Sequence, residues 1–403
     1  MSTRRDTVML LAAQSFYRLS GFVLVMVLAR TLSAADIGAF VFAMAFAESF
    51  VAIANFGMNS VVSRQIAADN TSAAERFAAL LGLRTVSGIV YVAAVMGASA
   101  FTSARWELML AATAIALTED LYFSFGSLFL ALRKAVYNVT VGMIVQTTFV
   151  AAFLVVMITR PSLWALVAVN AFRAVALVAV SVWLTRSRLF KLKVAWDSAS
   201  IRLAIPFVMM AAINALRDQI GAVMLGVLSN YDQVAHYNLV MRVATASLAV
   251  PTAICAVLAP LLVAHGLNSD NRRRIRIGIT GTLSSALALS AMILFLSDPL
   301  SRLLYGPLAP ETAPLLRILS VMLPVSFLAL FASLVLQALF REVHVLRTMA
   351  LATLTSFGVN LFLIPSLGAG GAIIAQILAT GVQLVILGWE LVRLLSADRQ
   401  PAV

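Results

Sequence analysis

The stretch NALRDQIGAVML, residues 214–225, places an arginine and an aspartate inside an apolar run that extends from Leu203 to Ser229. A run of about 20 apolar residues is long enough to cross the hydrocarbon core of a bilayer as a helix. Arg217 and Asp218 lie far from both ends of this run, so snorkelling does not bring them easily to water. The stretch therefore predicts a transmembrane helix with charges near mid-membrane.

The composition of the whole chain agrees with this prediction. Of its 403 residues, 62% are hydrophobic and 11% are charged, and the mean hydropathy is +0.99. A soluble protein of this composition would lack a polar surface, so the chain is predicted to be an integral membrane protein. Its single cysteine, Cys255, excludes a disulfide framework and a cysteine-based metal site. We expect no metal and no cofactor, and the only ions considered are H⁺ or Na⁺ in a coupling role.

The apolar segments predict about twelve transmembrane helices joined by short connections. This pattern indicates an all-α polytopic membrane protein without a sizeable extramembrane domain, because barrel strands would alternate over about 10 residues. The predicted spans cover residues 7–32, 37–62, 77–101, 108–132, 135–158, 163–184, 203–229, 234–263, 275–296, 313–340, 345–364 and 369–395.

The basic residues predict the orientation of the spans. Most of the 29 Lys and Arg residues, Arg84 among them, are assigned to the side that holds both termini. The other side holds only Arg30, Arg105, Arg160, Arg302 and Arg317. By the positive-inside rule, both termini are expected in the cytoplasm. The net charge of +12 follows mostly from this excess, so it does not indicate a nucleic-acid partner.

A basic segment at residues 187–202 divides the spans into two groups of six. It is predicted to be an interfacial linker on the cytoplasmic leaflet, between an N-terminal lobe at 1–186 and a C-terminal lobe at 203–403. The lobes share a repeat, because LSAADIGAFVFAM at 32–44 resembles LSNYDQVAHYNLVM at 228–241. An even number of spans per lobe predicts a pseudo-two-fold axis along the membrane normal, with a central cleft between the lobes.

Polar residues recur at helical spacing within several predicted spans, so we expect them to line that cleft. The first and seventh spans carry matching stripes, at positions 14, 17, 18 and 21 and at positions 214, 217, 218 and 221. Charged side chains at mid-membrane almost always face a bundle interior or a cavity. The candidate cleft-lining polar residues are Gln14, Tyr17, Glu48, Asn55, Gln146, Asn214 and Asn238.

Four arginines within the spans, Arg18, Arg173, Arg217 and Arg242, are the candidate binding residues for a phosphate or diphosphate group. A guanidinium keeps its charge and offers a rigid fork of donors that matches such a group. Asp120 and Asp218 are candidates for ion coupling or for plain charge balance. A structural alternative also stays open, in which Arg217 pairs with Asp120 or Glu48 and only fixes the packing. No catalytic motif is present, so the chain is not predicted to be an enzyme.

Several stretches resemble the polysaccharide and oligosaccharide flippases of the MOP (multidrug/oligosaccharidyl-lipid/polysaccharide) superfamily. They are LARTLSAADIGAFVFAMA at 28–45, NFGMNSVVSRQIA at 55–67, DQIGAVMLGVLSNYDQVAHYNLVMRV at 218–243, LSDPLSRLLYG at 296–306 and VNLFLIPSLGAGGAIIAQILA at 359–379. The resemblance implies a flippase of the bacterial inner membrane that moves undecaprenyl-diphosphate-linked oligosaccharides for a capsule, an O-antigen or an exopolysaccharide. It implies a lipid-linked oligosaccharide substrate, with other polysaccharide assembly proteins as possible partners.

Three alternatives stay open, one of them within the same superfamily. A multidrug exporter of the same superfamily would favour a carboxylate-dominated pocket, which fits poorly with four arginines within spans. A membrane-embedded polysaccharide polymerase would carry a substantial periplasmic loop, but the longest predicted outward connection, 297–312, is short. A membrane scaffold without transport would tolerate neutralisation of its buried charges.

Overall fold

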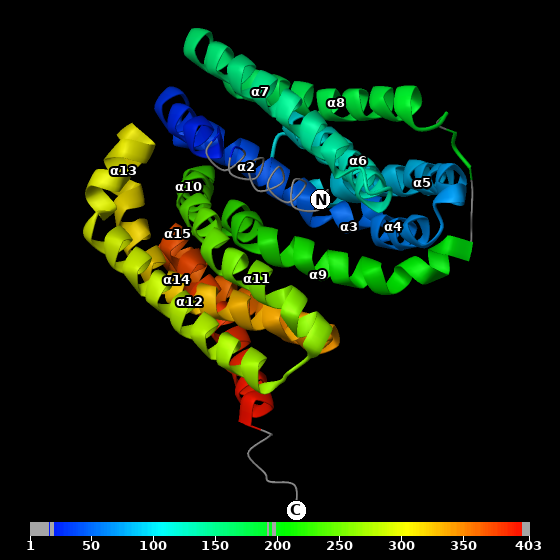
Figure 1. The fold of residues 1–403 in the computed structure, drawn as a ribbon. Helices are drawn as coiled ribbons and strands as arrows, with labels where there is room; N and C mark the ends of the chain where they lie inside the picture. Colours follow the sequence, from blue (N-terminus) through cyan, green and yellow to red (C-terminus); the bar gives the residue numbers. More distant parts are fainter. Residues whose placement is uncertain (1–15, 17–19, 192, 196–198, 397–403) are drawn as a thin grey trace, which may run out of the picture. The chain divides into compact units, whose positions relative to one another are not determined.

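A computed structural model describes residue 16 and residues 20–191, 193–195 and 199–396, and side chains within 199–206 are not described. Throughout these ranges the regular elements are helices, which confirms the predicted all-α class (Figure 1). The chain forms two compact units, 1–219 and 220–403, and helix α9 (Ala199–Leu228) continues from the first unit into the second. The predicted lobe boundaries at the 187–202 linker stay a prediction.

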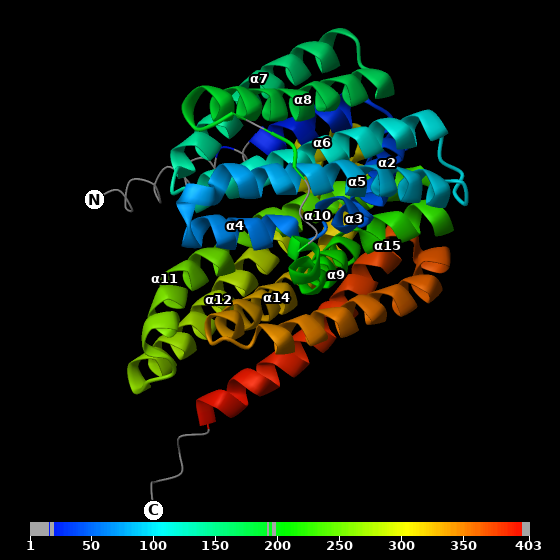
Figure 2. The same ribbon diagram turned by 90° about the vertical axis from the view of Figure 1, so that its right-hand side faces the viewer.

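The N-terminal unit is a bundle of long helices, in which α5 and α6 run side by side (Figure 2). After a helical segment at Ser20–Thr31, its elements are α2 (Ala34–Ser49), α3 (Val51–Asn55), α4 (Met58–Ala68), η1 (Asn70–Ser72), α5 (Ala73–Ser99), α6 (Trp106–Ala131), α7 (Ala135–Thr159) and α8 (Leu163–Arg188). The aromatic rings of Phe77 and Phe125 meet edge to face at 5.2 Å in a core shared by α4, α5 and α6.

The sequence repeat corresponds to two equivalent helix starts. At the start of α2, the Asp36 backbone N–H donates to Ser33 Oγ at 3.1 Å. At the start of α10, the Gln233 backbone N–H donates to Asn230 Oδ1 at 3.0 Å. Such caps satisfy backbone donors that have no partner within the helix. The negative charges of Asp36 and Asp232, in the first turns, also interact favourably with the positive end of the helix dipole. The two copies therefore share a capping function.

The second predicted span is bent where α2, α3 and α4 meet. Segments Ala34–Ser49 and Val51–Ala68 differ in direction by 42° across Phe50. A second break follows between α3 and α4, where Phe56 and Gly57 adopt left-handed backbone conformations, with φ of 47° and 66°. Ser87 Oγ on α5 donates at 2.8 Å to the carbonyl of Ala54, just before this break. A neighbouring helix thus satisfies backbone that the break exposes within the membrane.

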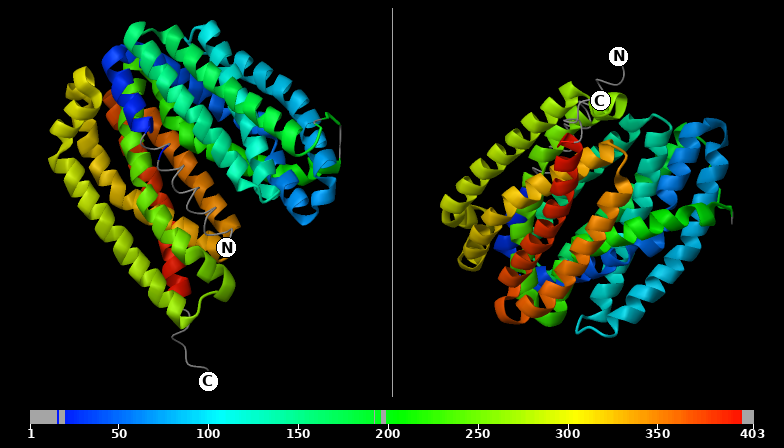
Figure 3. Two further views of the ribbon diagram at one scale, coloured as in Figure 1. Left: turned by 45° about the horizontal axis from the view of Figure 1, so that its top comes forward. Right: turned by 90° about the horizontal axis from the view of Figure 1, so that it is seen from below.

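The C-terminal unit is organised around α14, which packs against α10, α11, α12, α13 and α15 (Figure 3). A core cluster of Leu258, Ile275, Phe331 and Leu387 joins four of its helices. The elements are α10 (Tyr231–Ser247), α11 (Ala249–His265), α12 (Ser269–Phe295), α13 (Ser297–Tyr305), η2 (Gly306–Leu308), α14 (Ala309–Ala338) and α15 (Glu342–Ser396).

Helix α15 contains two predicted spans that meet at Gly368 (Figure 3, orange to red). Gly368 has a φ of 53°, which a residue with a Cβ rarely adopts. Directly after it, the Ala369 backbone N–H donates to Gln233 Oε1 on α10 at 2.8 Å. A Cβ on Gly368 would lie 2.5 Å from the same oxygen. The kink is therefore fixed by a glycine and by a side chain from another helix.

The number of spans agrees with the expectation once such joined helices are considered. Among the described residues, nine helices are long and apolar enough to cross a membrane, or ten when the bent pair is included. Helix α15 accounts for two predicted spans, 345–364 and 369–395, which the non-helical backbone of Gly368 separates. Much of the first predicted span, 7–32, lies outside the described residues.

Candidate functional site

Helix α6 carries two adjacent carboxylates that bind arginines on two different helices. Neighbouring residues of a helix point about 100° apart, so Glu119 and Asp120 face different partners. Glu119 forms an ion pair with Arg173 on α8, and Asp120 forms one with Arg84 on α5. The charges of α6 thus join it to both neighbours within the N-terminal unit.

The Arg84–Asp120 pair is the more deeply buried of the two. Its side chains are 5% and 6% exposed. Asn55 Nδ2 at the end of α3 donates to Asp120 Oδ1 at 3.3 Å, and an Arg84 terminal nitrogen donates to Asn59 Oδ1 on α4 at 3.2 Å. The break between α3 and α4 places both asparagines beside the pair. Hydrogen bonds to the charged groups reduce the cost of burying them.

Arg84 was missed as a site residue from the sequence, because it was assigned to a cytoplasmic connection. The structure places it inside α5 and buries it, so that assignment is wrong. An arginine in the first third of a predicted span usually snorkels to the interface. Here Asp120, 36 residues further along the chain, provides a buried partner instead. The available signal was Arg84 inside a segment already assigned to the membrane, 77–101.

Arg173, one of the predicted phosphate-binding arginines, forms its ion pair with Glu119. Besides contacting Glu119, its guanidinium lies over the Phe149 ring, 5.2 Å from the ring centroid. Its side chain keeps 25% exposure. A phosphate group approaching Arg173 would therefore compete with the Glu119 carboxylate. The predicted role of Arg173 stays a prediction.

The charges of the opening stretch lie on α9. Arg217 is half-buried and Asp218 is exposed. Among the described residues of the N-terminal unit, Arg217 forms no ion pair or hydrogen bond, and Asp120 is engaged by Arg84. The neighbouring Gln219 donates from Nε2 to Glu48 Oε2 on α2 at 2.6 Å. This contact joins α9 to the helix that carries the first copy of the repeat.

The remaining predicted residues have separate surroundings. Gln146 Nε2 on α7 donates to Ser20 Oγ at 2.9 Å, and Asn214 Nδ2 donates to the Met210 carbonyl of its own helix at 2.8 Å. Of the predicted residues, Asn55 and Asp120 are brought into direct contact. In the C-terminal unit, Arg242 is exposed and Asn238 is half-buried on α10. Gln14, Tyr17 and Arg18 lie outside the described residues.

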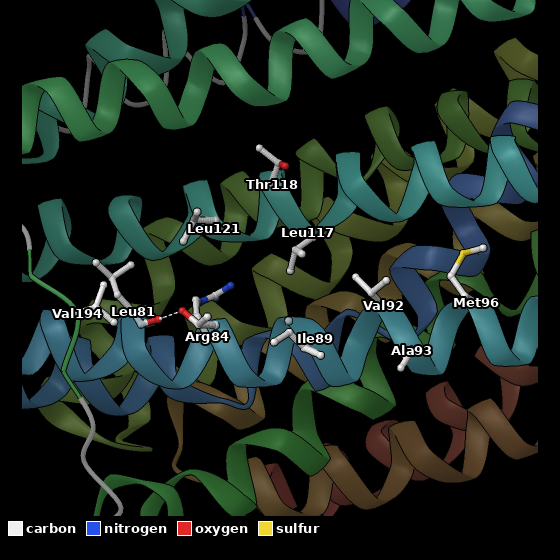
Figure 4. A pocket seen from close by; sticks show the side chains of 12 residues that line it. Leu81, Arg84, Ile89, Val92, Ala93, Met96, Leu117, Thr118, Leu121 and Val194 are labelled. Atoms are coloured by element: carbon white, nitrogen blue, oxygen red, sulfur yellow. Dashed lines mark hydrogen bonds between the residues drawn. The ribbon is translucent and has the colours of Figure 1, made fainter.

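The N-terminal unit also has a groove of about 750 Å³ between α5 and α6 (Figure 4). Most of its wall is aliphatic, and Arg84 is the charged residue among those that line it. The lining residues are Leu81, Arg84, Thr85, Gly88, Ile89, Val92, Ala93, Met96, Leu117, Thr118, Leu121 and Val194. In the described ranges, no cluster of three or more His, Cys, Asp or Glu residues is placed to hold a metal ion.

Comparison with solved structures shows which fold this arrangement belongs to. A lipid II flippase MurJ in an inward closed conformation has a TM-score of 0.78 at 13% identity, over 94% of this chain and 86% of that one. A multidrug resistance MATE family transporter of the MOP superfamily, in an inward-facing conformation, has a TM-score of 0.71 at 14% identity, over 95% and 96%. A MOP superfamily transporter from Pyrococcus furiosus has a TM-score of 0.59 at 15% identity, over 96% and 94%.

These structures are of flippases and transporters rather than enzymes, which agrees with the predicted class. No curated protein matches the sequence. A family model described as "Polysaccharide biosynthesis protein" matches residues 3–264, which confirms the resemblance found in the sequence. The chain is a multi-pass membrane protein with the MOP superfamily fold, and it belongs to the polysaccharide biosynthesis protein family.

Proposed function

We propose that the protein moves undecaprenyl-diphosphate-linked oligosaccharides across the bacterial inner membrane for polysaccharide assembly. A glycan and a diphosphate cannot cross hydrocarbon, whereas a polyprenyl tail can remain in it. The transporter therefore needs a sheltered cationic path for the head group. Membership of the polysaccharide biosynthesis family and a fold shared with a lipid II flippase support this substrate class.

The observation that supports the proposal best is that Arg217 lies deep in a predicted span. Its guanidinium lies in the middle of a membrane helix, half-buried, without an ion pair among the described residues of its unit. A charge at such a depth is costly, so such residues usually serve a substrate or ion pathway. A diphosphate is a suitable partner because a guanidinium binds two of its oxygens at once. In this proposal Arg18, Arg173 and Arg242 complete the cationic surface.

The head group would move by alternating access of the two lobes, with both termini in the cytoplasm. Of the two candidate coupling carboxylates, Asp218 is exposed, whereas Asp120 is buried against Arg84 and Asn55. An exposed carboxylate exchanges H⁺ or Na⁺ with water more readily. We therefore assign any ion coupling to Asp218 and a structural role to Asp120. Other polysaccharide assembly proteins would deliver the substrate and receive it.

Reconstitution into liposomes with a labelled polyprenyl-diphosphate glycan tests the proposal. Wild type should translocate the glycan, Arg217→Ala should lose at least about tenfold in rate, and Arg217→Lys should keep part of the activity because it keeps the charge. Arg160→Ala is the matched control, since Arg160 is an exposed arginine at the end of α7. Full activity of Arg217→Ala would refute the anion-binding role. Preferential transport of a lipophilic cation would favour a multidrug exporter instead.

A further inference from the structure

The groove between α5 and α6 has the dimensions of a site for a long lipid tail. Its wall follows α5 from Leu81 to Met96. At about 1.5 Å per helical residue, this stretch is about 22 Å long. One leaflet of a bilayer has a hydrocarbon thickness of about 15 Å, half of the full core. The groove is therefore longer than the hydrocarbon layer that an ordinary acyl chain occupies.

The groove is lined by residues of one unit and is accessible along its length. Ile89 is 67% exposed, and Ala93 is also exposed. Leu117 and Leu121 of α6 form the opposite wall and point toward α5 (Figure 4). On a membrane-spanning helix, exposed aliphatic side chains face hydrocarbon. An apolar chain can therefore enter this groove directly from the bilayer.

One end of the groove carries two lysines. Val194 forms part of the lining where the Ala195 backbone N–H donates to the Ala78 carbonyl at 3.0 Å. Lys193 directly precedes Val194, Lys191 lies three positions before it, and both are exposed. Beyond the opposite end, at Met96, the basic residue of the α5–α6 connection is Arg105, which pairs with Glu107 and lies over the Trp164 ring. The groove thus combines a long apolar wall with one end that carries two lysines and another whose arginine is paired.

We propose that this groove is a docking site for the polyprenyl tail of an anionic lipid, with the lipid phosphate at the end that carries Lys191 and Lys193. The inference rests on the proposed function, since a polyprenyl-diphosphate glycan has such a tail and head. Basic side chains at an interface attract anionic head groups. The length of the groove favours a polyprenyl chain over a phospholipid acyl chain. Docking here would collect substrate on the N-terminal unit before its head group is moved.

The proposal is tested by photo-crosslinking in liposomes, using a diazirine-tagged polyprenyl monophosphate that carries no sugar. We expect the label on α5 and α6 peptides, with competition by unlabelled undecaprenyl phosphate and little competition by phosphatidylglycerol. Ala93→Trp fills the groove and should lower the labelling roughly tenfold, which corresponds to about 1.4 kcal/mol. Val90→Trp is the matched control, because Val90 is exposed on α5 but does not line the groove.

A second pair of probes examines the basic end. Replacing Lys191 and Lys193 with Glu should weaken labelling by the phosphate probe and leave labelling by an uncharged polyprenol probe unchanged. Thr118→Phe, on the α6 wall, repeats the filling test if Ala93→Trp folds poorly. Equal labelling of the groove-filled and control variants would overturn the proposal. Equal competition by phosphatidylglycerol would also overturn it, by revealing an ordinary phospholipid site.

The experiments distinguish an error in the docking-site proposal from an error in the proposed function. If Ala93→Trp loses the label but wild type labels the groove without moving any glycan, the docking site stands and the flippase assignment falls. If wild type moves the glycan but the label is absent from α5 and α6, the flippase assignment stands and the docking site falls.

Discussion

Removal of one member of the Arg84–Asp120 pair would leave an uncompensated charge in the interior of the N-terminal unit. For a buried pair this typically costs about 3–5 kcal/mol. We expect Arg84→Met to lower the thermal unfolding temperature in detergent strongly, because both side chains are almost fully buried. The double variant Arg84→Met with Asp120→Leu should recover much of the loss. A single variant as stable as wild type would show that the charges are not coupled.

The Glu119–Arg173 pair is expected to behave differently, because it is partly exposed. If Glu119 competes with phosphate for Arg173, then Glu119→Gln should bind a polyprenyl diphosphate a few-fold more tightly than wild type. Arg173→Ala should bind it more weakly. Titration of both variants with a fluorescent lipid at constant ionic strength measures this, and Glu107→Gln, a partly exposed glutamate in the first turn of α6, serves as a control. An unchanged Kd for Glu119→Gln would remove Arg173 from the binding surface.

At the scale of single residues, the sequence identified the polar residues of the spans but not how they pair. The apolar run at 108–132 placed Glu119 and Asp120 within a predicted span. Which arginine each would meet depends on how α5, α6 and α8 pack. Arg84 was assigned to a cytoplasmic connection because local sequence cannot reveal a partner 36 residues away. The contact between Asn55 and Asp120 likewise depends on the break at Phe56 and Gly57.

At the scale of helices, the kink in α15 depends on the lack of a side chain at Gly368. We expect Gly368→Ala to destabilise the C-terminal unit by at least about 1 kcal/mol, because of the left-handed backbone and the close approach of Gln233 Oε1. Gly381→Ala is the matched control in the same helix, since its added Cβ would meet nothing within 4 Å. The control should be neutral or slightly stabilising. Thermal unfolding of both variants distinguishes strain from a general effect of alanine.

Helix positions were predicted well because a long apolar run by itself indicates a membrane-spanning helix. The breaks were harder to predict. Segments 345–364 and 369–395 were expected as separate spans, and the structure separates them by the kink at Gly368, although both lie within α15. The span at 37–62 was expected to be one helix, but it bends by 42°. Average hydropathy is insensitive to such local changes of backbone. Gly368 marks the kink in α15, whereas the 42° bend lies at Phe50, where no glycine indicates it.

At the scale of the whole molecule, orientation is the expectation most open to direct measurement. We expect a cysteine introduced by Asn230→Cys, in a Cys255→Ser background, to react with an impermeant maleimide added from the periplasm. A cysteine introduced by Asn268→Cys should react only after the inner membrane is opened, because the next connection lies on the opposite side. Both residues precede a helix as its cap, so their exposure is comparable. The reverse labelling pattern would invert the predicted topology.

Arg84 is synthesised before Asp120, and this order has a consequence for membrane insertion. Arg84 leaves the ribosome 36 residues before its partner, so α5 reaches the translocon with an unneutralised charge. Such a charge costs about 2.5–3.5 kcal/mol at a helix centre during insertion. We therefore expect α5 to enter the bilayer together with α6, as a helical hairpin. A chain truncated after Ser99 should integrate less completely than one truncated after Ala131, and Arg84→Leu should remove the difference in a glycosylation-mapping assay.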